Sequence, residues 1–233
     1  MSRSILALLL ASPAILAAPA IAQEAAAPAA GQMNPAQIEA FNKAVTNFQA
    51  GQAAQQAGDN AGAVAKYEAA LPAIRDAVKV QPDNIDNVNF LANALYADAA
   101  ANASSQQMDK VVPLFEESVP HFRKVVSAKP ADATSRNILA GILVQLGNAK
   151  LGAQDKAAAA PLYTEALPLA RKSVADAPAD AAANNILLSA LIGASQTSTD
   201  PTIKEEAVTL SKKMIADGSV DASNKPAAQA IAG

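Results

Sequence analysis

The stretch YTEALPLARKSVADAPADA, from Tyr163 to Ala181, decides the fold because the chain contains two more copies of it. The middle copy, FEESVPHFRKVVSAKPADA, begins at Phe115, and the first copy, YEAALPAIRDAVKVQPDNI, begins at Tyr67, so the three copies start at equal intervals. The positions that keep this interval include an aromatic residue, a proline and an arginine: Tyr67, Phe115 and Tyr163; Pro72, Pro120 and Pro168; Arg75, Arg123 and Arg171. A fixed interval of about 48 residues indicates a stacked array, in which each unit buries its apolar face against its neighbours.

The composition favours an array of helices. The chain has 233 residues, enough for one or two ordinary domains or for one solenoid of about four units. Hydrophobic residues make up 51%, much of it alanine, while aromatic residues make up only 3% and tryptophan is absent. Alanine is the strongest helix former, and no long alternation of apolar and polar residues predicts a sheet. We therefore predict an all-α protein with small side chains packed between close helices.

The repeat predicts four helix-turn-helix units and eight to nine helices. The units span 34–82, 83–130, 131–178 and, in a shorter form, 179–218. The expected helices are 35–56, 61–80, 83–102, 108–128, 131–151, 156–177, 179–195 and 201–216. Residues 219–233 form either a short capping helix from about Pro226 or a frayed tail. The second helix of each of the first three units contains one of the repeated prolines, which predicts a kink there.

Small, alanine and aromatic residues recur at fixed offsets inside the units. They are Gly51, Ala63, Tyr67 and Ala70 in the first unit, Gly147, Ala159, Tyr163 and Ala166 in the third, and the looser set Ala99, Val111, Phe115 and Ser118 in the second. Over about residues 34 to 222 this pattern resembles the tetratricopeptide repeat (TPR) family. The resemblance implies a TPR-like α-solenoid, in which the first helix of each unit lines a concave groove for a protein or peptide partner.

The unit is longer than that of the family it resembles. Twelve residues separate Ala70 from Pro82, where the family has about five, so each helix gains about seven residues. Seven residues add nearly two turns, which keeps the apolar stripe in phase. A HEAT-like array, whose period of about 40 to 47 residues is closer to the observed interval, is the alternative architecture.

Residues 1–22 have the pattern of a secretory signal peptide. Arg3 precedes an apolar stretch, and the triplet AIA before Gln23 forms a small-x-small cleavage site. Residues 23–33, mostly Ala, Pro and Gln, predict a disordered tail. Because the chain has no cysteine for a disulfide or a lipid, we predict a periplasmic or secreted product with no membrane insertion after cleavage. An uncleaved membrane anchor is the alternative.

Three arginines, which we call the arginine row, repeat with the units: Arg75, Arg123 and Arg171. Each lies seven residues before the closing proline of its unit, and an asparagine lies seven residues after that proline. A hairpin that turns at the proline would place the two side chains at one height. One hypothesis is that each arginine hydrogen-bonds the facing asparagine or a free carbonyl and braces the turn. The other is that the row binds carboxylate groups of a partner.

A second repeated set lies on the first helices of the units. It consists of Asn89 and Asn93, Asn137 and Gly141, and Asn185 and Ser189. The members of each pair are four residues apart and therefore share one helix face. In a TPR-like groove they would contact an extended peptide or a helix, because amides offer both donors and acceptors. The alternative is close helix packing at Gly141 and Ser189, with solvated amides.

No motif predicts catalysis, a cofactor or a metal site. His121 is the only histidine, and the chain has no cysteine nucleophile, no HExxH and no glycine-rich loop after a strand. We interpret Glu116, Glu117 and Glu165 as solvated carboxylates on polar helix faces. The sequence therefore predicts a protein that is not an enzyme.

The charge argues against a nucleic acid partner. Loss of Arg3 with the signal peptide leaves 17 basic against 21 acidic residues, a net charge of −4. The leading hypothesis is a non-enzymatic scaffold that binds a protein or peptide. The second is a structural envelope protein that self-assembles as a homo-oligomer, and the third is a binder of an anionic envelope polymer along the arginine row.

Overall fold

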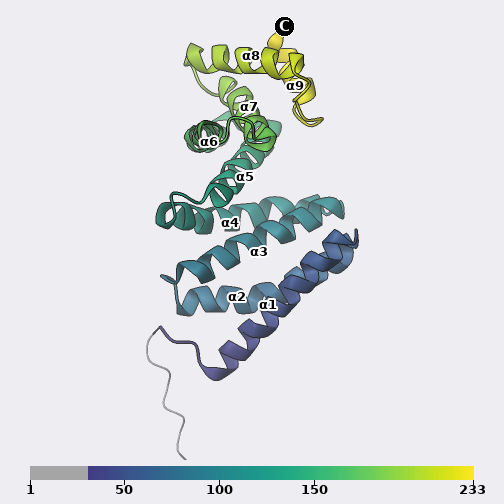
Figure 1. Ribbon diagram of the computed structural model, residues 1–233, viewed down its shortest axis with the longest axis vertical. Helices are drawn as coiled ribbons and strands as arrows, with labels where there is room; N and C mark the ends of the chain where they lie inside the picture. Colours follow the sequence, from purple (N-terminus) through teal and green to yellow (C-terminus); the bar gives the residue numbers. More distant parts are fainter. Residues whose placement is uncertain (1–30) are drawn as a thin grey trace, which may run out of the picture.

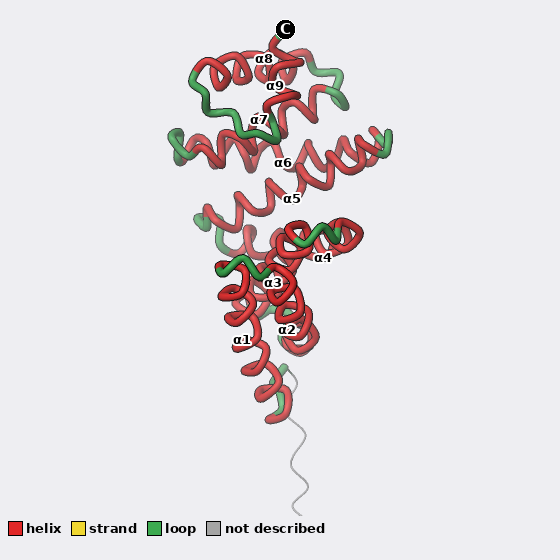
Figure 2. Tube along the Cα trace, turned by 90° about the vertical axis from the view of Figure 1, so that its right-hand side faces the viewer, coloured by secondary structure: helices red, strands yellow, loops and turns green. Residues whose placement is uncertain are grey.

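The computed structural model describes residues 31–233, so the predicted signal peptide and most of the predicted tail lie outside the described residues. Within this range all regular secondary structure is α-helical, as Figure 2 shows. The helices are α1 (Pro35–Gln56), α2 (Asn60–Val80), α3 (Ile85–Ser104), α4 (Met108–Ala128), α5 (Ala133–Gly152), α6 (Lys156–Asp176), α7 (Ala181–Ser195), α8 (Pro201–Ala216) and α9 (Lys225–Ala232). This confirms the predicted all-α class. None of these helices is long and apolar enough to cross a membrane.

The helices are stacked along the long axis of the molecule, from α1 at one end to α8 and α9 at the other (Figure 1). Each helix packs against the next helix of the chain. Among the first helices of the pairs, α1 also contacts α3, and α5 contacts α7. The described chain is therefore a TPR-like α-solenoid of helix-turn-helix pairs, as predicted.

Side-chain caps set the starts of the helices. The helices α3, α5 and α7 begin two residues later than predicted. The reason is that Asn84, Asp132 and Asp180 precede them as N-caps, with extended backbones and side chains that accept hydrogen bonds from the first turn. The residues between each closing proline and the next helix therefore form a turn and an N-cap.

The repeated prolines lie inside α2, α4 and α6 as predicted, and Pro113 and Pro161 add a second proline to α4 and α6. All five proline rings are exposed. Exposure allows water to bond the carbonyl group that loses its helical N–H donor, which reduces the cost of an interior proline.

A tyrosine that packs on a glycine joins the helices of the first and third pairs. Tyr67 of α2 and Tyr163 of α6 are fully buried. A Cβ atom on Gly51 would lie 2.6 Å from Cε1 of Tyr67, and one on Gly147 would lie 2.7 Å from Cζ of Tyr163. Because both distances are far below van der Waals contact, the rings need glycine at these positions.

The second pair lacks this contact because its glycine position holds Ala99. Ala99 is fully buried, and a Cβ atom at the equivalent Gly51 or Gly147 would lie within 3 Å of the tyrosine ring. Phe115, the aromatic residue of this pair, is only partly buried and lies against Tyr96 of α3 instead. The aromatic residue of this pair is therefore less buried than Tyr67 and Tyr163.

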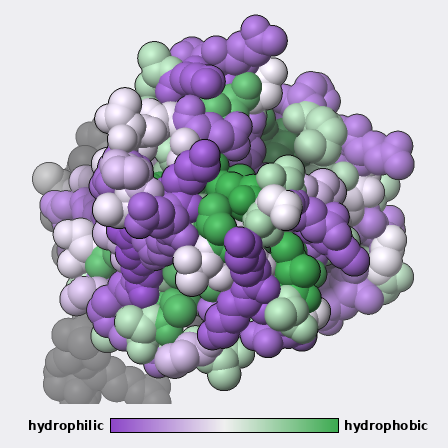
Figure 3. Space-filling model, turned by 90° about the horizontal axis from the view of Figure 1, so that it is seen from above, coloured by the Kyte–Doolittle hydropathy of each residue, from purple (hydrophilic) through white to green (hydrophobic). Residues whose placement is uncertain are grey.

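The helix α9 covers the apolar side of the last pair. Ala228 is fully buried and packs in one cluster with Leu188, Ile192 and Met214. Of the two predicted alternatives for the C-terminal segment, the structure therefore has the capping helix. Figure 3 views the molecule from this end, where a small group of hydrophobic side chains is surrounded by hydrophilic ones.

Candidate functional site

Three adjoining hollows run along the first helices of the pairs. Tyr96 and Ile138 line both the first hollow and the second, while Gly141, Gln145 and Ile186 line both the second and the third. Shared walls make them one continuous surface, which we call the inner groove. It is lined by Phe48 and Gln52 of α1, Asn93 and Tyr96 of α3, Asn137, Ile138, Gly141 and Gln145 of α5, and Ile186 and Ser189 of α7.

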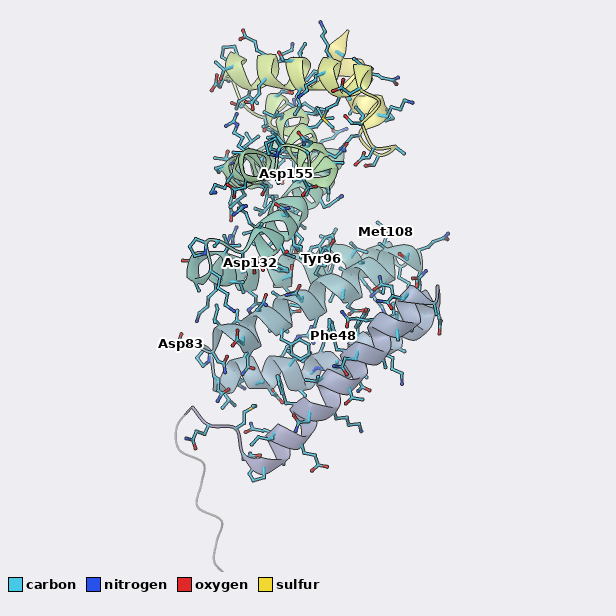
Figure 4. The ribbon with its side chains drawn as sticks, in the orientation of Figure 1. Phe48, Asp83, Tyr96, Met108, Asp132 and Asp155 are labelled. Atoms are coloured by element: carbon cyan, nitrogen blue, oxygen red, sulfur yellow. The ribbon has the colours of Figure 1, made fainter. Side chains whose placement is uncertain are left out.

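The middle of the inner groove is apolar. We call this part the apolar centre; it consists of Tyr96, Met108, Phe115, Ile138 and Ile186. The rings of Tyr96 and Phe115 stack with centroids 6.2 Å apart. Tyr96 is 37% exposed and Met108 is 62% exposed, and Figure 4 labels both side chains. Large apolar side chains that gather in a surface hollow are typical of a binding site.

The spacing of the helices explains why the groove is open at the apolar centre. In the described part of the chain, α3 and α5 have no Cα atoms within 8 Å of each other, whereas α5 and α7 do. The second hollow, with a volume of about 440 Å³, lies in this wider interval. It has room for a large side chain of a partner between the stacked rings and Ile138.

The groove is almost without charge. Among the residues that line its three hollows, Asp221 at the C-terminal end is the one charged side chain. Amides and hydroxyls supply the remaining polar groups. The surface is therefore suited to uncharged ligand groups rather than to carboxylates or phosphates.

The structure divides the predicted groove residues. Asn93, Asn137, Gly141, Asn185 and Ser189 line the hollows, but Asn89 does not. Asn93 donates through Nδ2 to the carbonyl oxygen and to Oδ1 of Asn89, at 2.8 and 2.9 Å. Asn137 has a buried acceptor, its Oδ1, that no donor of the described residues satisfies.

Asn185 has a structural role that the sequence did not predict. Its Nδ2 donates to the carbonyl oxygens of Ala181 and Ser219, at 2.9 and 3.0 Å, and its Oδ1 accepts from the backbone N–H of Asp221 at 2.9 Å. Nδ2 of Asn224 also donates to the carbonyl oxygen of Asn185, at 3.0 Å. Because these bonds occupy its side-chain amide, Asn185 holds the segment before α9 in place.

The arginine row does not contact the asparagines that we predicted as its partners. Each arginine instead forms a two-pronged ion pair with a glutamate on the second helix of the next pair. The pairs are Arg75 with Glu117, at 2.6 and 2.8 Å, Arg123 with Glu165, at 2.8 and 2.6 Å, and Arg171 with Glu206. The predicted bracing role was assigned to the wrong contact: the row joins neighbouring units rather than the two sides of one turn.

The prediction failed because it considered one hairpin in isolation. Each glutamate lies 42 residues after its arginine in the first two pairs and 35 after it in the last, which places it one unit further along the stack. Glu117 and Glu165, which we interpreted as solvated, are therefore engaged in ion pairs. The hydrogen bond to the carboxylate raises the pKa of each arginine above its ordinary value.

A buried arginine contributes a further contact that sequence reasoning missed. Arg136 is 4% exposed; its Nε donates to Oγ of Ser173 at 3.1 Å, and its Nη2 donates to Oδ2 of Asp176 at 2.7 Å. The contact joins α5 to α6. The signal in the sequence is that Arg136 occupies the repeat position that the apolar Val88 holds in the preceding unit, which puts a charged residue at a core position of the repeat.

Comparisons with known proteins give no evidence about the function of this chain. No protein-family model matches the chain, and no curated protein matches it. A solved structure described as "Crystal structure of MamA protein" is similar at 14% sequence identity, over 75% of this chain and 94% of that one, with a TM-score of 0.33. A similarity of this size carries no argument about what the chain binds.

Proposed function

We propose that this chain is a non-enzymatic TPR-like scaffold that binds a protein or peptide segment in its inner groove. The observation that supports this function best is the apolar centre, where the stacked rings of Tyr96 and Phe115 and the exposed Met108 line one hollow. Partly exposed aromatic and methionine side chains in a concave surface are enriched where proteins bind one another.

The lining of the groove determines the chemistry of the partner. An apolar side chain of the partner enters the hollow between α3 and α5, since this is where the apolar centre lies. The amides of Asn137 and Gln145 and the hydroxyl of Ser189 lie along the same surface and bond the partner's backbone groups. We therefore propose an uncharged segment with at least one large apolar residue.

A peptide selection tests this function. A library of displayed random peptides is selected for binding to the chain from Gln23 onward. The selected sequences should share large apolar residues and lack net charge. Binding of a selected peptide, measured by fluorescence anisotropy, should weaken about tenfold or more when Met108 is changed to serine. The matched control is Ile215→Ser, since Ile215 is an exposed aliphatic residue on α8 outside the groove. Selected peptides that are consistently acidic or basic would contradict the proposal.

The proposed location is the periplasm or the extracellular space, and it rests on the signal pattern of residues 1–22. Mass spectrometry of the exported protein should find a chain that begins at Gln23. A chain that keeps residues 1–22 in a membrane fraction would contradict this part of the proposal.

The two other hypotheses have less support. The guanidinium groups of the arginine row already bond carboxylates, so an anionic polymer would have to displace three ion pairs. Self-assembly is tested by light scattering of the purified chain, for which our proposal predicts the mass of one copy. A concentration-dependent increase in mass would favour the structural hypothesis.

A further inference from the structure

A further hollow, with a mostly charged lining, lies outside the inner groove and is lined by α2, α3 and α4. Its volume is about 440 Å³, and we call it the α2–α4 cavity. Leu71, Pro113 and Leu114 form its apolar walls, and its charged lining consists of Glu68 and Arg75 of α2, Asp98 of α3, and Asp109, Lys110 and Glu117 of α4.

Two acids of this cavity form no ion pair within the described residues. Arg75 pairs with Glu117, and Nζ of Lys110 lies 2.7 Å from Oε1 of Glu68. No ion pair of the described residues includes the other two acids of the lining, Asp98 and Asp109. The cavity therefore carries two more negative charges than positive ones.

Asp98 forms the floor of the α2–α4 cavity and is 2% exposed. Its Oδ1 accepts a hydrogen bond from Nδ2 of Asn102 at 2.9 Å, and no donor of the described residues bonds its Oδ2. Oδ1 of Asn102 is buried and has no hydrogen-bond partner within the described residues. Both unfilled positions are acceptors, so what this part of the molecule lacks is a hydrogen-bond donor with positive charge.

The repeat itself shows that the fold does not require a carboxylate here. At the equivalent positions of the next junction, Leu146 replaces Asp98, and Ala157 and Ala158 replace Asp109 and Lys110. Leu146 is buried in the main core cluster. A buried carboxylate without a cation is costly compared with such a leucine, so the first junction carries a polar floor that its counterpart lacks.

We propose that the α2–α4 cavity binds an alkylammonium group, with the carboxylate of Asp98 as its main acceptor. The ammonium group donates to Oδ2 of Asp98, and the attached methylene groups lie against Leu71 and Leu114. A divalent metal ion fits less well, because such ions take six or more oxygen ligands and the described residues contain no group of three possible metal ligands. This site is independent of the inner groove.

Binding should depend on pH because only the ionised carboxyl group carries the negative charge that attracts an ammonium group. Burial raises the pKa of Asp98 to about 6, with repulsion from Glu68 adding to the rise and Lys110, Arg75 and the hydrogen bond from Asn102 opposing it. Asp109 and Glu117 are the remaining charged groups of the cavity. Affinity for the ammonium group should therefore fall about tenfold between about pH 7 and about pH 5.

The experiment titrates the chain from Gln23 onward with n-butylammonium chloride and follows the side-chain amide signal of Asn102 by NMR. This amide reports on the site because it bonds Asp98. Tetramethylammonium chloride is the negative control, because it has the same charge and no N–H donor. Nα-acetyl-lysine amide is the second primary amine, and it presents the ammonium group as a lysine side chain of a protein would. We expect saturable shifts with the two primary amines and none with tetramethylammonium; binding of either amine supports the site, and the tighter of the two identifies its source.

Two variants separate the site from the fold. Asp98→Asn keeps the size of the side chain, and Asp98→Leu reproduces the residue found at the next junction; both should weaken n-butylammonium binding about tenfold or more. Glu165→Gln at the next junction is the control and should leave it unchanged. Circular dichroism shows whether each variant is folded. Equal binding by tetramethylammonium, unchanged affinity in a folded Asp98 variant, or no saturable shift in the wild type at neutral pH would overturn the proposal.

Discussion

The ring of Phe115 stacks on the ring of Tyr96, with an angle of 22° between their planes. The equivalent rings of Tyr67 and Tyr163 are fully buried against glycines. The repeat thus buries its aromatic residue in two units and presents it at the inner groove in the unit between them. Phe115 is therefore available to line the groove, where it forms part of the apolar centre.

The close contact at Gly147 predicts a large effect from one methyl group. Gly147→Ala should destabilise the protein by about 1 to 3 kcal/mol, because the new Cβ would overlap the ring of Tyr163. Gly152→Ala in the same helix is the control, since no atom outside the adjoining backbone lies within 4 Å of its Cβ position. Denaturant unfolding measures both, and equal stability of the two variants would contradict the assigned packing.

The ion pairs of the arginine row predict modest and coupled effects. Arg123→Met and Glu165→Gln should each cost about 0.2 to 1 kcal/mol, because both side chains are partly exposed and solvent screens the pair. The double variant should cost less than the sum of the two, and salt should reduce the difference. Lys66→Met, at an exposed position of α2 without an ion pair in the described structure, is the control. Strictly additive losses would show that the pair does not form in solution.

Asp98 predicts a pH-dependent stability difference between the wild type and Asp98→Asn. Its pKa is raised from 3.8 to about 6 in the folded protein, so the folded state binds the proton more tightly than the unfolded state. Wild-type stability should therefore fall, relative to the variant, as pH rises from about 4 to about 6, by at most about 3 kcal/mol. Urea unfolding of both proteins across this range provides the measurement. Parallel stability curves would mean that Asp98 is not desolvated.

The hydrogen bonds of Asn185 predict a local effect at the C-terminal end. Asn185→Ala should remove the bonds to Ser219 and Asp221 and cost about 1 to 3 kcal/mol. Hydrogen exchange should become faster in α9 and remain unchanged in α1 and α2. The control is Ser189→Ala, one turn further along α7, whose hydroxyl forms no hydrogen bond within the described structure. Uniformly faster exchange along the chain would contradict the local role.

The fold could be predicted from the sequence because the same pattern of residues occurs three times. The interval between Tyr67, Phe115 and Tyr163 predicted the stacked hairpins. Three helices start two residues later than predicted, since the prediction began each of them directly after the proline and not after the cap. Periodicity reports which residues share a face, but caps depend on local backbone geometry.

The candidate site was predicted less completely, for a physical reason. The search for repeated residues found Asn93, Asn137 and Ser189, but Tyr96 and Met108 do not repeat and were missed. The partner of Arg123 was also missed, because a contact between units depends on how neighbouring helices are stacked. A search for residues that recur at the repeat interval passes over positions that differ between units, and Tyr96 and Met108 lie at such positions.

The proposal that the inner groove binds a peptide is tested most directly by methyl NMR of the isoleucine residues during titration with a selected peptide. Ile138 and Ile186 line the apolar centre, whereas Ile38 on α1 and Ile215 on α8 are exposed outside it. Our account predicts that the signals of Ile138 and Ile186 shift in proportion to occupancy while those of Ile38 and Ile215 remain in place. Saturable shifts at Ile38 or Ile215, with Ile138 and Ile186 unchanged, would contradict it.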